Sequence, residues 1–144
     1  MKISFTGSRS GMNDKQKENF AKVLKSSKAS QFTHGDCIGA DLDAHKVAHD
    51  LGLAINKRPC DIERMRAWTS EGVNVAEPEP PLDRNKKIVD DGKILVACPA
   101  YLKEEQRSGT WATVRYARKC QKPIVLLWPD GRVEFENWAN LKKV

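Results

Sequence analysis

Three short segments of the sequence combine glycine with hydroxyl, acidic or basic side chains directly after an apolar stretch. These segments are Thr6–Arg9, His34–Asp41 and Ser108–Thr110. Glycine after a strand permits a tight turn and a close approach of the backbone to a ligand. Unpaired N–H groups at the start of a following helix attract phosphate, and side-chain hydroxyls add further donors. The three segments therefore predict a binding site for a small anion.

The first and third segments supply most of the expected phosphate contacts. The residues assigned to them are Gly7, Ser8, Arg9, Ser108, Gly109, Thr110 and Thr113. The arginine adds a two-pronged donor suited to phosphate or carboxylate. An ordinary strand–helix turn explains the first segment equally well, and a simple helix cap explains the third. Both interpretations stay open for each segment.

The middle segment adds acidic groups to the expected site. Its candidate ligand contacts are His34, Gly35, Asp36, Gly39 and Asp41. The carboxylates of Asp36 and Asp41 are acceptors that suit sugar hydroxyls, and either one is a candidate catalytic acid. An acid at a helix start, such as Asp41, also stabilises the helix dipole without touching a ligand. The segment is not the Gly-x-Gly-x-x-Gly fingerprint of dinucleotide-binding proteins.

Asp41, His45 and His49 are spaced by four residues, which places them along one face of a helix. Histidines at that spacing can bind zinc, but the His-Glu-x-x-His motif is absent. A solvated helix face next to an apolar stripe is the favoured interpretation. We therefore expect no metal site and no other cofactor.

Apolar and helical patterns alternate along the chain, which predicts an α/β fold with a mainly parallel sheet of about five strands. Continuous apolar runs in the later strands indicate a sheet covered by helices on both faces. In such sheets ligands bind at the carboxyl ends of the strands, where all three glycine-containing segments fall. The expected strands are 2–5, 31–33, 53–57, 93–98 and 123–128, and the expected helices are 13–26, 40–51, 84–91 and 110–120.

Residues 60–83 form a long excursion between two of these elements. Ile62, Met65 and Trp68 have the spacing of one short helix, whereas the proline-rich run 77–81 cannot be helix interior. Long connections of this kind often serve as lids or binding loops. A surface loop without a role is an equal alternative.

The composition is that of a globular chain. It has 144 residues, 40% of them hydrophobic and 31% charged, and its longest apolar runs, 94–98 and 124–128, are far too short to cross a membrane. We expect one domain over residues 1–144, with 132–144 as a C-terminal extension adding a short strand and a terminal helix. The net charge is +6, but residues 29–81 hold nine acidic and five basic groups. That uneven distribution disfavours a continuous nucleic-acid-binding stripe and suits a pocket for a small anion.

Four cysteines bear on the compartment. None of them forms a Cys-x-x-Cys pair, which argues against a zinc ribbon or a thioredoxin-type site. Cys98 and Cys120 are expected to be small buried hydrophobic residues. With no signal-peptide pattern at the N-terminus, the sequence predicts a cytoplasmic protein with reduced thiols and no membrane association.

With these segments placed, the chain resembles the SLOG superfamily of Rossmann-like nucleotide-binding proteins. That superfamily includes the Lonely Guy phosphoribohydrolases and the DNA-processing protein A family. The resemblance covers about residues 2–131 and is strongest to small stand-alone members found in bacteria and phages. It implies a doubly wound Rossmann-like fold. The segments that carry it are 5–9, 34–41, 84–85, 108–110 and 116–123.

The resemblance also implies residue roles. Arg84, followed by Asn85, stands where Lonely Guy enzymes have a catalytic arginine, and Gly109–Thr110 resembles their phosphate-binding loop. Those enzymes carry a catalytic glutamate three residues after that threonine, where this chain has Thr113. A threonine cannot stabilise a positively charged transition state as a carboxylate does. The departure puts phosphoribohydrolysis by the Lonely Guy mechanism in doubt.

Three functions follow, in this order of preference. The first is a sensor or sequestering module that binds a small nucleotide or a nucleotide-derived ligand. The second is hydrolysis of the N-glycosidic bond of a nucleotide, with Asp36 or Asp41 as the acid and Arg84 stabilising charge. The third is single-stranded DNA binding, to which the four tryptophans could contribute by stacking. Superfamily members often dimerise, so a homodimer is left open.

Overall fold

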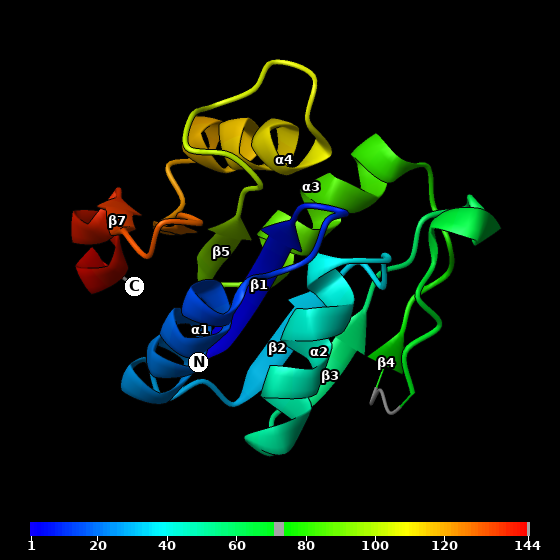
Figure 1. Ribbon diagram of the computed structural model, residues 1–144, viewed down its shortest axis with the longest axis horizontal. Coiled ribbons are helices and arrows are strands. Elements are labelled where there is room, and N and C mark those ends of the chain that lie inside the picture. The colour runs from blue at the N-terminus through cyan, green and yellow to red at the C-terminus, as the bar shows by residue number, and fades with distance from the viewer. Residues whose placement is uncertain (71–73, 144) are drawn as a thin grey trace.

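Seven strands form a single sheet in the computed structural model, which describes residues 1–70 and 74–143 (Figure 1). The spatial order is β4-β3-β2-β1-β5-β6-β7. The first six strands are parallel, and β7 runs antiparallel to β6. The strands are β1 (Lys2–Gly7), β2 (Gln31–His34), β3 (Ala54–Lys57), β4 (Asn74–Val75), β5 (Ile94–Cys98), β6 (Ile124–Leu127) and β7 (Val133–Glu136).

In the described residues four α-helices cover this sheet, with one short 3-10 helix between β3 and β4 and another after β7. Apolar side chains of α1 and α2 pack on one face, and those of α3 and α4 pack on the other. The prediction of a mainly parallel sheet between helical layers is confirmed. The helices are α1 (Asp14–Ser26), α2 (Ala40–Asp50), α3 (Pro81–Asp91), α4 (Gly109–Lys119), η1 (Glu63–Met65) and η2 (Trp138–Lys143).

The two cores on either side of the sheet follow from alternation along the strands. Phe5, Phe20 and Phe32 meet on the first face, with ring centroids 5.4 to 5.8 Å apart. Trp111 and Trp128 meet on the second face at 5.6 Å. In β5, alternate residues enter opposite cores and all five are buried. This two-sided burial explains the uninterrupted apolar run that the sequence shows there.

Helix boundaries follow from local chemistry. Asn13 caps α1 by accepting the Gln16 N–H at 2.9 Å, while the Gln16 side chain accepts the Asn13 N–H at 3.1 Å. Helix α3 begins at Pro81 instead of at 84, because a proline at the first helical position loses no intrahelical hydrogen bond.

The structure corrects three expectations. The sheet has seven strands instead of about five, because the two-residue strand β4 and the antiparallel strand β7 extend its edges. The short helix expected from Ile62, Met65 and Trp68 is reduced to the single turn η1, and Trp68 is left 60% exposed. Cys98 is buried as expected, but Cys120 is exposed because it lies just beyond the end of α4.

Candidate functional site

A cavity of about 520 Å³ opens at the carboxyl ends of β1, β2 and β5. The loops that follow these three strands meet there, as the topology requires when neighbouring parallel strands end at one edge. Nine of the residues assigned to the site from the sequence line this cavity: Gly7, Ser8, Arg9, Asp41, Arg84, Asn85, Ser108, Gly109 and Thr110.

Two glycines pack the first loop tightly against the start of α2. A Cβ atom on Gly7 would lie 2.5 Å from the Cβ atom of Ala40, and one on Gly39 would overlap the Arg9 carbonyl. Gly39 also has a φ of 102°, which side chains rarely adopt. The Ser8 carbonyl accepts the Ala40 N–H at 2.9 Å. These glycines therefore fix the loops against one another.

The third loop leaves an unused donor at the cavity. Ser108 caps α4 by accepting the Trp111 N–H at 3.3 Å, and a Cβ atom on Gly109 would meet nothing within 4 Å. Thr110 is only 6% exposed, yet its hydroxyl has no hydrogen-bond partner in the described part of the chain. Thr113 instead donates its hydroxyl to the Gly109 carbonyl at 2.9 Å and lies outside the cavity lining.

The guanidinium of Arg84 holds the second loop together. Its Nη1 atom donates to the carbonyls of Gly35 at 2.7 Å and Arg58 at 3.2 Å. Its Nε atom donates to Asn85 Oδ1 at 2.9 Å, and Nη2 lies 3.5 Å from the sulfur of Cys37. Arg84 is buried, so it contributes positive charge to the cavity while its donors act mainly on the protein itself.

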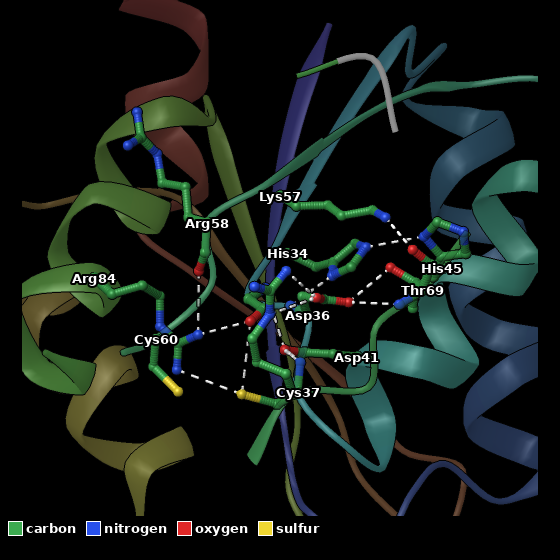
Figure 2. Close-up of polar contacts among 12 residues, drawn as sticks. His34, Asp36, Cys37, Asp41, His45, Lys57, Arg58, Cys60, Thr69 and Arg84 are labelled. Carbon is green, nitrogen blue, oxygen red and sulfur yellow. Dashed lines mark hydrogen bonds and ion pairs between the residues drawn. The ribbon is translucent and has the colours of Figure 1, made fainter. Parts of the chain in front are cut away.

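Asp41 is the buried carboxylate of the cavity. One of its oxygens accepts the N–H groups of Gly35 and Cys37, both at 3.1 Å (Figure 2). Burial raises the pKa of Asp41 to about 6, although the charge of Arg84 and the two hydrogen bonds oppose the rise. Burial likewise raises the pKa of the Cys37 thiol to about 11, so that thiol stays protonated at neutral pH.

Asp36 and His34 point away from the cavity, contrary to expectation. Asp36 accepts hydrogen bonds from Arg66 at 3.0 and 3.1 Å and from Thr69 at 2.7 and 2.9 Å. Burial alone would raise the pKa of Asp36, but hydrogen bonds from Thr69 and Arg66 hold it below its usual value. Asp36 is therefore an anchor for residues 66–69, and nothing in its placement suits a catalytic acid.

From the sequence, we interpreted Asp41, His45 and His49 as one solvated helix face, and for His45 that interpretation was wrong. His45 is buried against His34, at 3.0 Å between Nε2 of His34 and Nδ1 of His45. His49 lies one turn further along α2, with its ring stacked on that of His45. Over residues 1–70 and 74–143, no group of three histidine, cysteine or acidic residues could hold a metal ion.

Several lining residues had not been assigned to the site. Arg107 adds a third arginine beside Arg9 and Arg84, whereas Glu105 adds an acid. Arg107 directly precedes Ser108, so its position next to the third segment was the available signal. The exposed side chains of Ile38, Leu82 and Tyr101 form an apolar rim whose position depends on tertiary packing alone.

Comparison with known proteins rests on structure. No protein-family model and no curated protein sequence matches this chain. Its fold is similar to the X-ray structure of TM1055, with a TM-score of 0.64 and 17% identity over 88% of this chain and 73% of that one. It is also similar to a molybdenum cofactor binding protein from Rippkaea orientalis, with a TM-score of 0.67 and 18% identity over 88% and 76% of the two chains.

A third similar structure is DNA processing protein A from Streptococcus pneumoniae. The TM-score is 0.64 and the identity 17%, over 87% of this chain but only 49% of that protein. Each of the three similarities covers 87 or 88% of this chain. The chain shares the fold of these three proteins. Identities this low establish the shared architecture and leave the ligand to be argued from the site. No helix in the described residues is long and apolar enough to cross a membrane.

Proposed function

We propose that this protein binds a small nucleotide or nucleotide-derived ligand, with its phosphate at the start of α4. The observation that carries the proposal is the hydroxyl of Thr110, which belongs to a residue of the cavity lining and makes no hydrogen bond to the described part of the protein. A hydroxyl that no protein group uses is free to donate a hydrogen bond to a ligand oxygen. The adjacent N–H groups of the helix start favour the same anionic group.

Charge and shape around Thr110 support a phosphorylated ligand. Arg9 and Arg107 line the cavity and provide exposed donors, while Arg84 contributes charge from its fixed position. The rim formed by Ile38, Leu82 and Tyr101 offers apolar surface at the mouth. A nucleotide combines an anionic end with a planar, weakly polar end, and both ends match this arrangement.

Binding is favoured over hydrolysis because no acid occupies the position of the Lonely Guy catalytic glutamate. Thr113 stands where a catalytic glutamate is needed, and its hydroxyl is committed to the Gly109 carbonyl. Asp41 is the remaining buried carboxylate, but two backbone N–H groups hold one of its oxygens. Such an Asp41 is better suited to shaping the loop than to protonating a leaving group.

One assay separates these functions. Excess protein is incubated with a panel of nucleoside mono-, di- and triphosphates and cyclic nucleotides, the protein is filtered off, and filtrate and denatured protein are chromatographed. Binding predicts an intact nucleotide recovered from the protein fraction, and no free base in the filtrate. Free base produced catalytically, and lost in Asp41→Asn, would establish hydrolysis instead. If neither fraction differs from a control without protein, the nucleotide proposal fails.

Single-stranded DNA binding is a second candidate, favoured by one specific observation. Trp68 is 60% exposed, and the Arg66 guanidinium lies 3.7 Å from its ring centroid, so an exposed aromatic ring stands beside a positive charge, a pairing suited to stacking with a base. The similar structures include a DNA processing protein A whose single-stranded DNA binding mode has been described, from Helicobacter pylori. Affinity for an oligonucleotide that falls steeply with salt and is lost in Trp68→Ala would favour this candidate.

A further inference from the structure

Two histidines lie behind the cavity and are joined in a buried hydrogen-bonded chain (Figure 2). His34 ends β2, and its Nδ1 atom accepts the backbone N–H of Asp36 at 2.8 Å. Its Nε2 atom lies 3.0 Å from Nδ1 of His45 on α2. Neither side chain lines the cavity, and the proposed ligand site uses neither of them.

The backbone N–H of Asp36 fixes the protonation of both rings. A backbone N–H can only donate, so Nδ1 of His34 carries no proton and the ring proton sits on Nε2. That Nε2–H must donate to His45, so Nδ1 of His45 carries no proton either. Both imidazoles are therefore neutral. An added proton on either Nδ1 atom would face another N–H group and break one hydrogen bond of the chain.

The groups around the pair make a proton costly. The pKa of His34 is lowered to about 3, mainly by burial and also by His45, Lys57 of β3 and Arg84 of α3, whereas the neighbouring Asp36 opposes them. Asp41 lies on α2 with His45, and His49 stacks on the His45 ring. Arg66, which faces Asp36 from the other side, is already paired with that carboxylate.

Asp36 connects this pair to residues 62–69, which we call the strap. The Asp36 carboxylate binds Arg66 and Thr69, and its carbonyl accepts the Ala67 N–H at 2.7 Å. The strap in turn places Met65 in the cavity wall, where its carbonyl accepts the Ile38 N–H at 3.0 Å. One wall of the cavity thus depends on Asp36, and the backbone N–H of Asp36 donates its hydrogen bond to Nδ1 of His34. The two histidines are therefore linked to the cavity wall through Asp36.

We propose that the His34–His45 pair is a proton-sensitive latch: the closed strap requires both rings to be neutral, and acid releases the strap from the cavity wall. The consequence for ligand, a loss of affinity in acid, rests on the proposed function. The latch itself does not, because it concerns the ligand-free protein. The effect of acid on the opening equilibrium of the strap follows from the difference in pKa between the closed and open states. In the open state a released imidazole regains its ordinary pKa of about 6.5. Each histidine that takes up a proton on opening then multiplies the opening equilibrium about thirtyfold at pH 5.0.

Amide hydrogen exchange on the ligand-free protein tests the latch at pH 7.5 and 5.0, with rates converted to protection factors. The amides of Ala67 and Thr69 report the strap, and the Leu95 amide, bonded to the Pro123 carbonyl, reports global unfolding. We expect strap protection to fall at least about thirtyfold in acid while Leu95 protection holds. Unchanged strap protection in the wild-type protein would overturn the proposal.

Two variants locate the effect. His34→Asn keeps an acceptor for the Asp36 N–H that does not titrate, so its strap protection should respond to acid less than that of the wild-type protein, because only His45 is left to take up a proton. His49→Asn removes another histidine of α2, one that is not part of the hydrogen bonds between Asp36, His34 and His45. Its strap protection should respond to acid as that of the wild-type protein does. An equal response in His34→Asn and wild type would refute the latch.

A measurement on the wild-type protein alone covers the case in which His34→Asn does not fold. Long-range ¹⁵N–¹H spectra at pH 7.5 should show both rings as Nε2–H tautomers. A charged ring or an Nδ1–H tautomer at either position would overturn the proposal. Because no ligand enters these experiments, a failed nucleotide assay and a failed latch are distinguishable.

Discussion

Arg84, which lines the cavity, is joined to Gly35 by a hydrogen bond of 2.7 Å from Nη1 of the arginine to the glycine carbonyl. A Cβ atom at position 35 would lie 2.5 Å from that same Nη1 atom and 3.0 Å from Oδ2 of Asp41. The glycine is thus required by the approach of two charged groups. This relationship makes the second loop a built structure whose shape depends on one guanidinium.

Arg84→Lys should therefore destabilise the fold although it keeps the charge. A lysine ammonium cannot reproduce contacts from three guanidinium nitrogens, so the Gly35 and Arg58 carbonyls lose donors. We expect the free energy of unfolding to fall by about 2–3 kcal/mol in urea titrations. Arg132→Lys, at an exposed surface pair, is the control and should change it by less than about 0.5 kcal/mol. Equal stability of the two variants would contradict the account.

Two glycine substitutions separate folding from binding. Gly35→Ala places a methyl group against Arg84 and Asp41, so it should lower the unfolding midpoint markedly. Gly109→Ala meets nothing within 4 Å and should leave the midpoint nearly unchanged, while its methyl group occupies space beside Thr110. Urea titration measures the unfolding midpoints of both variants. Nucleotide retention measures whether the added methyl group of Gly109→Ala weakens binding. A stable Gly35→Ala variant would show that the loop tolerates rearrangement.

Asp41 should make stability depend on pH in an unusual direction. Its pKa in the folded protein is raised to about 6 from an ordinary value of 3.8, so the folded state binds the proton more tightly than the unfolded state. This contribution is fully present below about pH 4 and is lost as the pH rises through 6. Relative to Asp41→Asn, the wild-type protein should lose about 3 kcal/mol between these limits. Parallel stability curves for the two proteins would contradict it.

The cysteines should differ sharply in reactivity. Cys120 is exposed, whereas the pKa of the Cys37 thiol is raised to about 11 by burial, which leaves little thiolate at neutral pH. Iodoacetamide at pH 7.5 should modify Cys120 at least about tenfold faster than Cys37, as followed by mass spectrometry of peptides. Faster labelling at Cys37 would mean that the loop opens readily in solution.

The sequence predicted the layers of the fold well because its signals are local. Asn13 marked a helix start, and the buried run of β5 marked a strand covered on both faces. Of the two edge strands, β4 was missed for a physical reason. It has only two residues, so pairing with its neighbour defines it, whereas the short strand expected within residues 132–144 is present as β7.

The site was predicted less completely, because the spacing of residues along the sequence does not tell in which direction their side chains point. Asp36 and Asp41 both looked like ligand acceptors, yet only Asp41 lines the cavity. The difference depends on Arg66 and Thr69, which reach Asp36 from a strap about 30 residues further along the chain. The pairing of His34 with His45 was likewise hidden, since it joins a strand end to the middle of a helix.

The central claim is that the Thr110 hydroxyl binds the phosphate of a nucleotide. Equilibrium dialysis of nucleoside monophosphates should compare wild type with Thr110→Val and Thr113→Val, two changes of the same shape on one helix. Because the Thr110 hydroxyl has no protein partner, Thr110→Val should keep the stability and lose about tenfold in affinity, whereas Thr113→Val should keep its affinity. Equal affinity of Thr110→Val and wild type, or binding by none of the three proteins, would contradict the account.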